Sequence, residues 1–221
     1  MKLKENENVL VLGGFLGITA LISALVLALV FTVTRGPIEK MQKKSLQESF
    51  KLLALPDFDN APDQEAKSYI SPEKFKVIIM PVRKNGVLKA FAVRSISPDG
   101  YAGEVEVTCG FDLQKKILAV LVTRQQETPS LGSNVCERKF RKTLFNLFKA
   151  APEGLPPNPI LDQFHGLTVP ENGSWQVKRD GGTFDFVTGA TITSRAVTAA
   201  VEQAGKTLHI HWGEFMENVK K

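Results

Sequence analysis

The chain has 221 residues, of which 43% are hydrophobic, and a formal net charge of +5. The basic residues are scattered and not interleaved with aromatic ones, which argues against a nucleic-acid-binding surface. Cys109 and Cys136 form no CxxC pair, which argues against haem, iron–sulfur and zinc sites built on paired cysteines. The same two cysteines are compatible with either a disulfide or two buried thiols.

The N-terminal region carries no charge from Val9 to Val33. As a helix this run would be roughly 37 Å long, enough to cross a hydrocarbon core of about 30 Å. It is too long for the apolar part of a cleaved signal peptide, and no Ala-x-Ala-like cleavage site follows it. We therefore expect a short tail and an uncleaved transmembrane anchor over residues 1–35. Gly13 and Gly17 lie at a spacing that lets another helix approach, although glycine is common in any membrane helix.

Residues 36–67 are expected to connect the anchor to the rest of the chain. The pattern of Ile38 to Leu53 is amphipathic at helical spacing and predicts a juxtamembrane helix that ends before Pro56. The stretch from Pro56 to Lys67 is rich in Asp, Pro and Ala and predicts a loop. Residues 68–221 are then expected to form one domain with its own core.

An antiparallel meander is predicted from residue 76 onward. Short apolar or alternating runs are separated by turn signals at Lys84-Asn85-Gly86, at Pro98-Asp99-Gly100 and at residues 112–116. In the run from Glu104 to Phe111, one face holds the apolar side chains Val105, Val107 and Cys109. The expected strands cover residues 76–82, 87–93, 104–111 and 117–123.

Two helices and two short strands are expected after the meander. One helix is predicted over residues 134–150, followed by a proline-rich loop and short strands near 166–169 and 175–178. The last helix is expected to begin near Ser194 and to bury Val197, Ala200, Val201 and Leu208. The fold class is therefore α+β: one N-terminal transmembrane helix, then one domain with an antiparallel sheet and flanking helices.

A loop rich in hydroxyl groups precedes the last helix. It reads Asp-Phe-Val-Thr-Gly-Ala-Thr over residues 185–191 and runs into Ile-Thr-Ser. The first backbone amides of a helix are unpaired and its dipole is positive at this end, so such a loop is suited to a phosphate. Alone, it could equally be a turn and a helix cap.

This loop resembles the flavinylation motif of FMN-binding domains, Asp-x-x-Ser/Thr-Gly-Ala-Thr. The matching positions are Asp185, Thr188, Gly189, Ala190 and Thr191. In that family the last threonine carries FMN through a phosphoester, so the resemblance implies covalent FMN on Thr191. Thr193 is expected to be a cap or a phosphate contact, and it is the second choice for the attachment site.

A second segment, Glu-Thr-Pro-Ser-Leu-Gly over residues 127–132, is similar to the Glu-Thr-Pro-Gly-Leu-Gly loop of FMN-binding subunits in Rnf and Na⁺-translocating NADH:quinone reductase complexes. Ser130 stands where glycine is usual, and Arg124, Gln125 and Gln126 precede the loop where histidine is usual. The resemblance implies that this loop lies against the flavin, through Glu127, Thr128, Leu131 and Gly132. Residues 100–103, Gly-Tyr-Ala-Gly, resemble a further segment of the same family.

Size and the single anchor make the chain most similar to the G subunits of Rnf complexes. The resemblance implies a covalent flavoprotein that relays electrons within an ion-translocating ferredoxin:NAD⁺ oxidoreductase, with other membrane subunits as partners. It also implies a separate flavin transferase that takes FMN from FAD with Mg²⁺. We expect no catalytic residue and no metal ligand in the chain itself, and it has no Rossmann Gly-x-Gly-x-x-Gly.

The membrane side is predicted differently by two arguments. The lysines and arginine on either side of the anchor favour, by a small margin, a cytoplasmic C-terminal domain. The resemblance implies the extracytoplasmic side of a bacterial inner membrane, and we adopt this expectation because the charge difference is small.

Three alternative functions remain open. The first is the C subunit of the Na⁺-translocating quinone reductase. The second is a membrane-tethered binding or sensor module without redox function. The third is an accessory domain that supplies electrons to a separate reductase.

Overall fold

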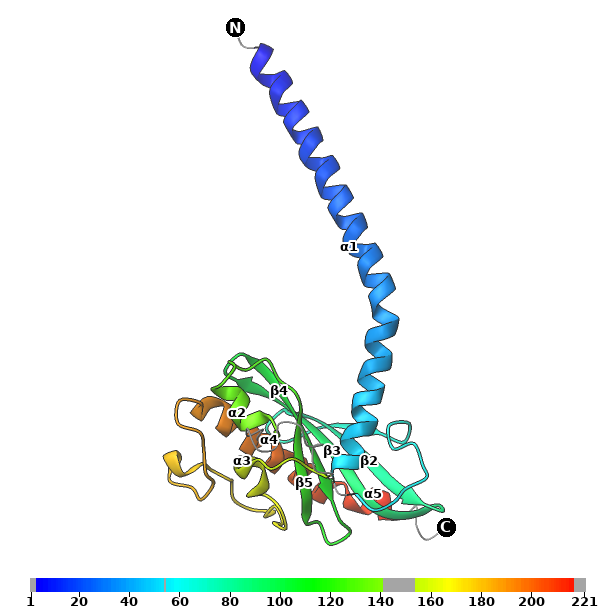
Figure 1. The fold of residues 1–221 in the computed structure, drawn as a ribbon, viewed down its shortest axis with the longest axis vertical. Helices are drawn as coiled ribbons and strands as arrows, with labels where there is room; N and C mark the ends of the chain where they lie inside the picture. The colour runs from blue at the N-terminus through cyan, green and yellow to red at the C-terminus, as the bar shows by residue number, and fades with distance from the viewer. Residues whose placement is uncertain (1–2, 54, 141–153, 217–221) are drawn as a thin grey trace, which may run out of the picture. The chain divides into compact units, whose positions relative to one another are not determined.

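The computed structural model describes residues 3–53, 55–140 and 154–216 (Figure 1). The chain divides into two compact units, residues 1–47 and 48–221. Most of the first unit is one helix, α1 (Leu3–Leu52), whose last residues belong to the second unit. This single helix contains both the expected anchor and the expected juxtamembrane helix, with Pro37 inside it.

The segment Val11–Ile38 of α1 is long and apolar enough to span a membrane. Its few hydroxyl groups bond to the carbonyl oxygens one turn earlier in the same helix, as Thr19 Oγ1 does to Phe15 O and Ser23 Oγ to Thr19 O. A hydroxyl satisfied in this way costs less in hydrocarbon than an unpaired one. The segment therefore has the composition and the internal hydrogen bonding that a membrane helix requires.

The second unit is built on a five-stranded antiparallel sheet, which contains the four strands of the predicted meander and one more. Its strands are adjacent in chain order: β1 (Lys67–Ile70), β2 (Lys76–Lys84), β3 (Val87–Gly100), β4 (Gly103–Phe111) and β5 (Ile117–Arg124). The β2–β3 turn is the predicted one, with Asn85 and Gly86 at φ of 51° and 75°. The α+β fold class is confirmed.

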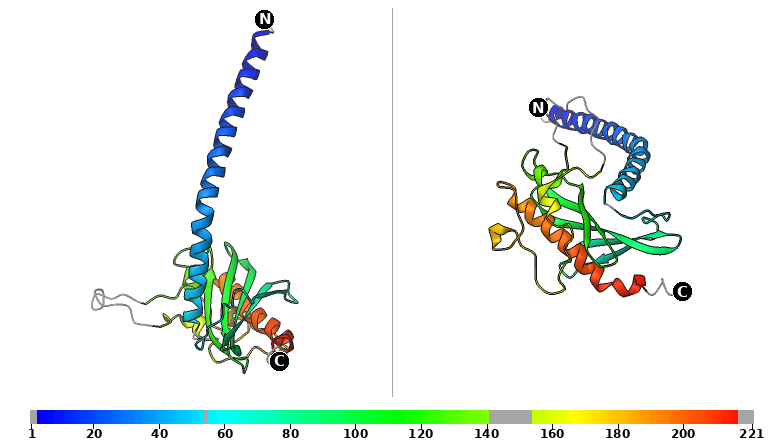
Figure 2. Two further views of the ribbon diagram at one scale, coloured as in Figure 1. Left: turned by 90° about the vertical axis from the view of Figure 1, so that its right-hand side faces the viewer. Right: turned by 60° about the horizontal axis from the view of Figure 1, so that its bottom comes forward.

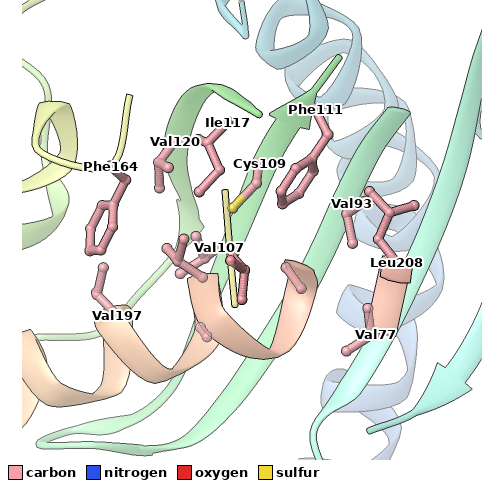
Figure 3. Close-up of a cluster of buried hydrophobic side chains, with 14 of the residues drawn as sticks. Val77, Val93, Val107, Cys109, Phe111, Ile117, Val120, Phe164, Val197 and Leu208 are labelled. Atoms are coloured by element: carbon pink, nitrogen blue, oxygen red, sulfur yellow. The ribbon is translucent and has the colours of Figure 1, made fainter. Parts of the chain in front are cut away.

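One long helix, α4 (Thr191–Ile210), lies along one face of the sheet (Figures 1 and 2). Its buried stripe includes Val197, Ala200, Val201 and Leu208, as predicted. These side chains pack into one cluster with the inward residues of the strands, among them Val93, Val107 and Cys109 (Figure 3). Hydrophobic burial between α4 and the sheet thus fixes where the N-terminus of this helix lies.

The opposite face of the sheet is covered by the last turn of α1 and the residue after it. Phe50 and Leu53 are almost fully buried. A Cβ added at Gly110 would lie 2.8 Å from Leu53 O, so the backbone passes close over β4 at this point. Since Gly110 neighbours the inward-facing Cys109 in a strand, this contact lies on the other side of the sheet.

Two strand predictions differ from the structure. β1 was not expected, because its exposed sequence Lys-Ser-Tyr-Ile lacks apolar alternation. β3 continues through Pro98 to Gly100, where a turn was predicted, and the reversal follows at Tyr101-Ala102. A register shift between Ser97 and Gly100 accommodates Pro98, which has no amide hydrogen to donate to a ladder.

The helix predicted over residues 134–150 is confirmed at residues 134–136 and is wrong at residues 137–140. α2 (Gly132–Cys136) ends early, and residues 137–140 are not helical. The side-chain amide of Asn158 donates to three carbonyls at this helix end, those of Asn134, Val135 and Glu137. These carbonyls would bond to later amides if the helix continued. Residues 141–150 of the prediction lie outside the described residues.

The remaining elements are short. The expected strands near 166–169 and 175–178 are single bridges, Lys116 to Thr168 and Val177 to Phe184. The proline-rich loop contains α3 (Pro159–Asp162), and a 3₁₀ turn η1 (Lys178–Asp180) precedes the motif loop. α4 begins three residues earlier than predicted, and α5 (Trp212–Met216) follows it.

Candidate functional site

A cavity of about 520 Å³ lies where four separate segments of the chain meet. This volume is within the roughly 300–1,000 Å³ typical of ligand pockets. The β3–β4 turn contributes Tyr101, and η1 contributes Arg179. The remaining lining residues belong to residues 127–132, called the α2 loop because they lead into α2, and to the end of the motif loop with the first turns of α4: Glu127, Thr128, Leu131, Gly132, Gly189, Ala190, Thr191, Ile192, Thr193 and Arg195.

The N-terminus of α4 borders this cavity. Thr191 is the first residue of the helix, and no side chain among the described residues caps it. Because the first amides of a helix have no partner within it, those of Thr191, Ile192 and Thr193 are available to an anion. Thr191 is 7% exposed, and its Oγ1 accepts a hydrogen bond of 2.9 Å from Arg179 Nη1.

A second arginine lines the same cavity but is paired. Arg195 donates two hydrogen bonds to Asp180, of 2.6 and 2.5 Å. These bonds, followed by the charges of Arg195 and Arg179, hold the pKa of Asp180 below its usual value. The same pairing raises the pKa of Arg195. The positive charge of Arg195 is therefore largely balanced by its own partner.

Glu127 is buried where the α2 loop meets α4. Its Oε2 accepts a 2.7 Å hydrogen bond from Thr193 Oγ1, and its Oε1 accepts one of 3.3 Å from the amide of Ala102. A Cβ added at Gly132 would lie 2.6 Å from Glu127 Oε2 and 2.9 Å from Thr193 Oγ1. Glycine at position 132 thus permits the close approach between Glu127 and Thr193 that joins the loop before α2 to α4.

Two residues in these loops have a left-handed backbone conformation. Gly189, in the flavinylation-like motif, has a φ of 85°, which glycine adopts without steric cost. Ser130 has a φ of 64° at the position where the similar loops have glycine. The left-handed conformation gives a physical reason for glycine there, and Ser130 adopts it in this chain at some cost.

Most of the residues predicted from the sequence come together in this cavity. Glu127, Thr128, Leu131 and Gly132 face the second group, which is Gly189, Ala190, Thr191 and Thr193. Asp185 and Thr188 are exposed and do not line it. The Asp185 carboxylate instead accepts a 2.5 Å hydrogen bond from Lys178, and its backbone is held at both polar atoms by the side chain of Gln163.

Four lining residues were not predicted as site residues: Tyr101, Arg179, Ile192 and Arg195. Ile192 follows Thr191 in α4 and Arg195 lies four residues after it, about one helical turn, so helical spacing from Thr191 was the signal that could have found them. Tyr101 lies in the Gly-Tyr-Ala-Gly segment, and the likeness of that segment to FMN-binding subunits was the signal for it. No local pattern marks Arg179, since it reaches the cavity only because η1 folds against α4.

The part of the chain that surrounds the cavity also matches a known protein family. A family described as "FMN-binding domain" matches residues 100–206, which include every residue that lines the cavity. The G subunit of the ion-translocating oxidoreductase complex of Vibrio parahaemolyticus is 40% identical over 168 residues, or 71% of each chain. The protein of the same name from Pseudomonas aeruginosa is 30% identical over 197 residues, covering 86% of this chain and 83% of that one.

The chain belongs to this family of G subunits. A third member, from Haemophilus influenzae, is 29% identical over 191 residues and covers 84% of the chain. The cavity fits the cofactor of an FMN-binding domain by its chemistry. The guanidinium of Arg179, the first amides of α4 and the hydroxyl of Thr191 lie together there, and all three suit a phosphate. It also has exposed apolar surface on Tyr101, Leu131 and Ile192, which suits a flat aromatic ring system.

Proposed function

We propose that this chain is a membrane-anchored flavoprotein that carries FMN on Thr191 and relays electrons within an Rnf-type ion-translocating ferredoxin:NAD⁺ oxidoreductase complex. Membership of the G-subunit family and the FMN-binding domain support the general assignment. The observation that carries the covalent attachment is the place of Thr191. Its hydroxyl lies at the cavity, within the sequence Asp-x-x-Thr-Gly-Ala-Thr, on the first residue of a helix that no described side chain caps.

The attachment is a phosphoryl transfer to a side-chain hydroxyl. Thr191 Oγ1 forms a bond to the flavin-side phosphorus of FAD, the pyrophosphate bond to AMP breaks, and AMP leaves. The hydroxyl proton passes to a base, which we assign to the separate flavin transferase with its Mg²⁺, because a free threonine hydroxyl is a poor nucleophile. A cation beside Oγ1 favours the negative charge that develops on this oxygen.

The two halves of the motif have different roles in this proposal. Thr191, Gly189 and Ala190 line the cavity and hold the cofactor. Asp185 and Thr188 are exposed outside it, so we assign them to recognition by the transferase. Glu127, Thr128, Leu131 and Gly132 form the opposite wall, with Thr193 fixed by its bond to Glu127.

FMN, when bound, supplies one- and two-electron chemistry that no side chain of the cavity offers. The protein residues hold it, set the charge around it and limit its contact with water. The phosphoester leaves the ring system unmodified and prevents loss of the cofactor. We place the domain on the extracytoplasmic side, tethered by Val11–Ile38, with other membrane subunits of the complex as partners.

Mass spectrometry of the full-length protein tests this proposal. Protein isolated from its native membrane should carry an added mass of ~438 Da, one FMN less water, on the peptide that contains Thr191. Thr191→Ala should lack it, and Thr193→Ala should retain it. Unmodified protein from a host that has the transferase would contradict covalent attachment and favour the binding or sensor module. Protease treatment of spheroplasts, compared with inverted vesicles, tests the membrane side.

A further inference from the structure

Arg179 is the cation closest to the hydroxyl of Thr191 in the described structure. It lies in the short turn η1, which is closed by bonds from the Gly181 amide to Lys178 O and from the Gly182 amide to Val177 O. Its Nη1 donates to Thr191 Oγ1 over 2.9 Å, and both residues line the cavity. The backbone bonds of the turn and of α4 keep these two residues close together, and the exposed side chain of Arg179 reaches Thr191 from there.

The neighbouring cations are already engaged with carboxylates. Arg195 is paired with Asp180 through two hydrogen bonds, and Lys178 with Asp185. For Arg179, no ion pair with a carboxylate occurs among residues 3–53, 55–140 and 154–216. The charge of Arg179 does lower the pKa of the Asp180 carboxyl, but it is the weakest of the causes that do so. Among the described residues, Arg179 is therefore a guanidinium of the cavity that forms no ion pair with a carboxylate.

A guanidinium in this position suits a phosphate. It is planar, permanently charged, and presents parallel N–H groups that match phosphate oxygens. A phosphorus atom bonded to Thr191 Oγ1 would lie one covalent bond from the atom that Arg179 already contacts. The non-bridging oxygens of a phosphodiester would then give Arg179 a negatively charged partner.

We propose that Arg179 binds the phosphate group of the flavin at Thr191 and thereby makes the cavity select a phosphorylated flavin over riboflavin. This inference rests on the proposed function, since it concerns the same cavity. Riboflavin has the same ring system and side chain without the phosphate, so it gains nothing from the guanidinium. The selectivity exists before any ester forms and survives in a protein that cannot form it.

The test uses full-length protein in detergent with Thr191→Ala, so that no ester forms. FMN and riboflavin are titrated separately, and binding is followed by quenching of flavin fluorescence. Adding Arg179→Gln should weaken FMN binding at least about tenfold and leave riboflavin binding within about twofold, since only the charged contact is removed. Arg179→Lys, which keeps the charge without the planar fork, should lie between the two.

Arg124→Gln is the matched control in the same Thr191→Ala background. Arg124 carries the same charge but is exposed and pairs with Glu104 outside the cavity, so FMN binding should change by less than about twofold. Unaltered riboflavin binding by the Arg179→Gln protein shows that the cavity is still folded.

Three results overturn the inference: an unchanged ratio of FMN to riboflavin affinity, an equal loss of both ligands, or no FMN binding to the Thr191→Ala protein. The proposed ester is judged separately, by the mass of the unmutated chain. An ester on Thr191 with an unchanged affinity ratio contradicts only the role of Arg179. A lowered ratio without any ester contradicts only the covalent attachment.

Discussion

Thr193 Oγ1 donates a 2.7 Å hydrogen bond to Glu127 Oε2, although the two residues are 66 positions apart. Both side chains are buried, and Thr193 is only 1% exposed. The bond joins the loop before α2 to the first turn of α4. Since Glu127 Oε1 also accepts from the Ala102 amide, one carboxylate connects three of the four segments around the cavity.

Thr193→Val should therefore destabilise the domain. Valine has nearly the shape of threonine, so the main change is loss of a donor to a buried carboxylate, which costs about 1.5–3 kcal/mol. Urea unfolding of the full-length protein in detergent, followed by tryptophan fluorescence, measures this loss. Thr168→Val, at an exposed position, is the control and should change the free energy of unfolding by less than about 0.5 kcal/mol. Equal stability of the two variants would contradict the connecting role of Glu127.

The sequence predicted the meander and the buried face of α4 because both depend on local periodicity. Val105, Val107 and Cys109 alternate in a strand, and the buried α4 residues recur at helical spacing. The end of α2 could not be predicted in this way. It depends on Asn158, which lies more than twenty residues later and occupies the carbonyls of α2.

In the candidate site, too, the features set by local sequence were predicted and those set by distant contacts were not. The motif loops were recognised as continuous segments, and the structure brings eight of the ten predicted residues to one cavity. Arg179 was not recognised because its contact with Thr191 is set by how η1 packs. Asp185 lies in the motif but outside the cavity lining, since Gln163 holds its backbone and Lys178 its carboxylate.

Ser130→Gly should stabilise the protein. The φ of 64° at Ser130 is unfavourable for a residue with a Cβ, and its relief should contribute about 1 kcal/mol, even though glycine adds freedom to the unfolded chain. Asn85→Gly is the matched control, because Asn85 also has a positive φ but asparagine tolerates this region well. The midpoint of urea unfolding should rise more for Ser130→Gly than for Asn85→Gly. The reverse order would show that Ser130 is not strained.

The two thiols should resist alkylation in the folded protein. Cys109 and Cys136 are both buried and free. Burial raises the pKa of Cys136 to about 12, with smaller contributions from Glu127 and Glu137, and burial raises that of Cys109 as well. At pH 8 only about one Cys136 thiol in ten thousand would be ionised, and the thiolate is the reactive form.

Iodoacetamide labelling followed by intact mass measurement checks this expectation, with urea-unfolded protein as the positive control. Because the folded state keeps the Cys136 proton that the unfolded state loses above pH 9, stability should fall as the pH rises from about 9 to about 12. Cys136→Ala should reduce this alkaline loss. Rapid labelling of folded protein at pH 8 would show that at least one of the two thiols is accessible and ionised.

Glu127→Gln should raise the reduction potential of the bound flavin. A buried carboxylate at the cavity opposes the addition of electrons nearby, and the isosteric amide removes its negative charge. We expect a rise of at least about 30 mV, equivalent to about 1.4 kcal/mol for a two-electron couple. Spectroelectrochemical titration of the flavin-loaded protein measures it. Glu104→Gln, which removes an exposed carboxylate paired with Arg124, should shift the potential by less than about 10 mV, because water screens its charge. An equal shift in both variants would mean that Glu127 acts only through the overall charge of the domain.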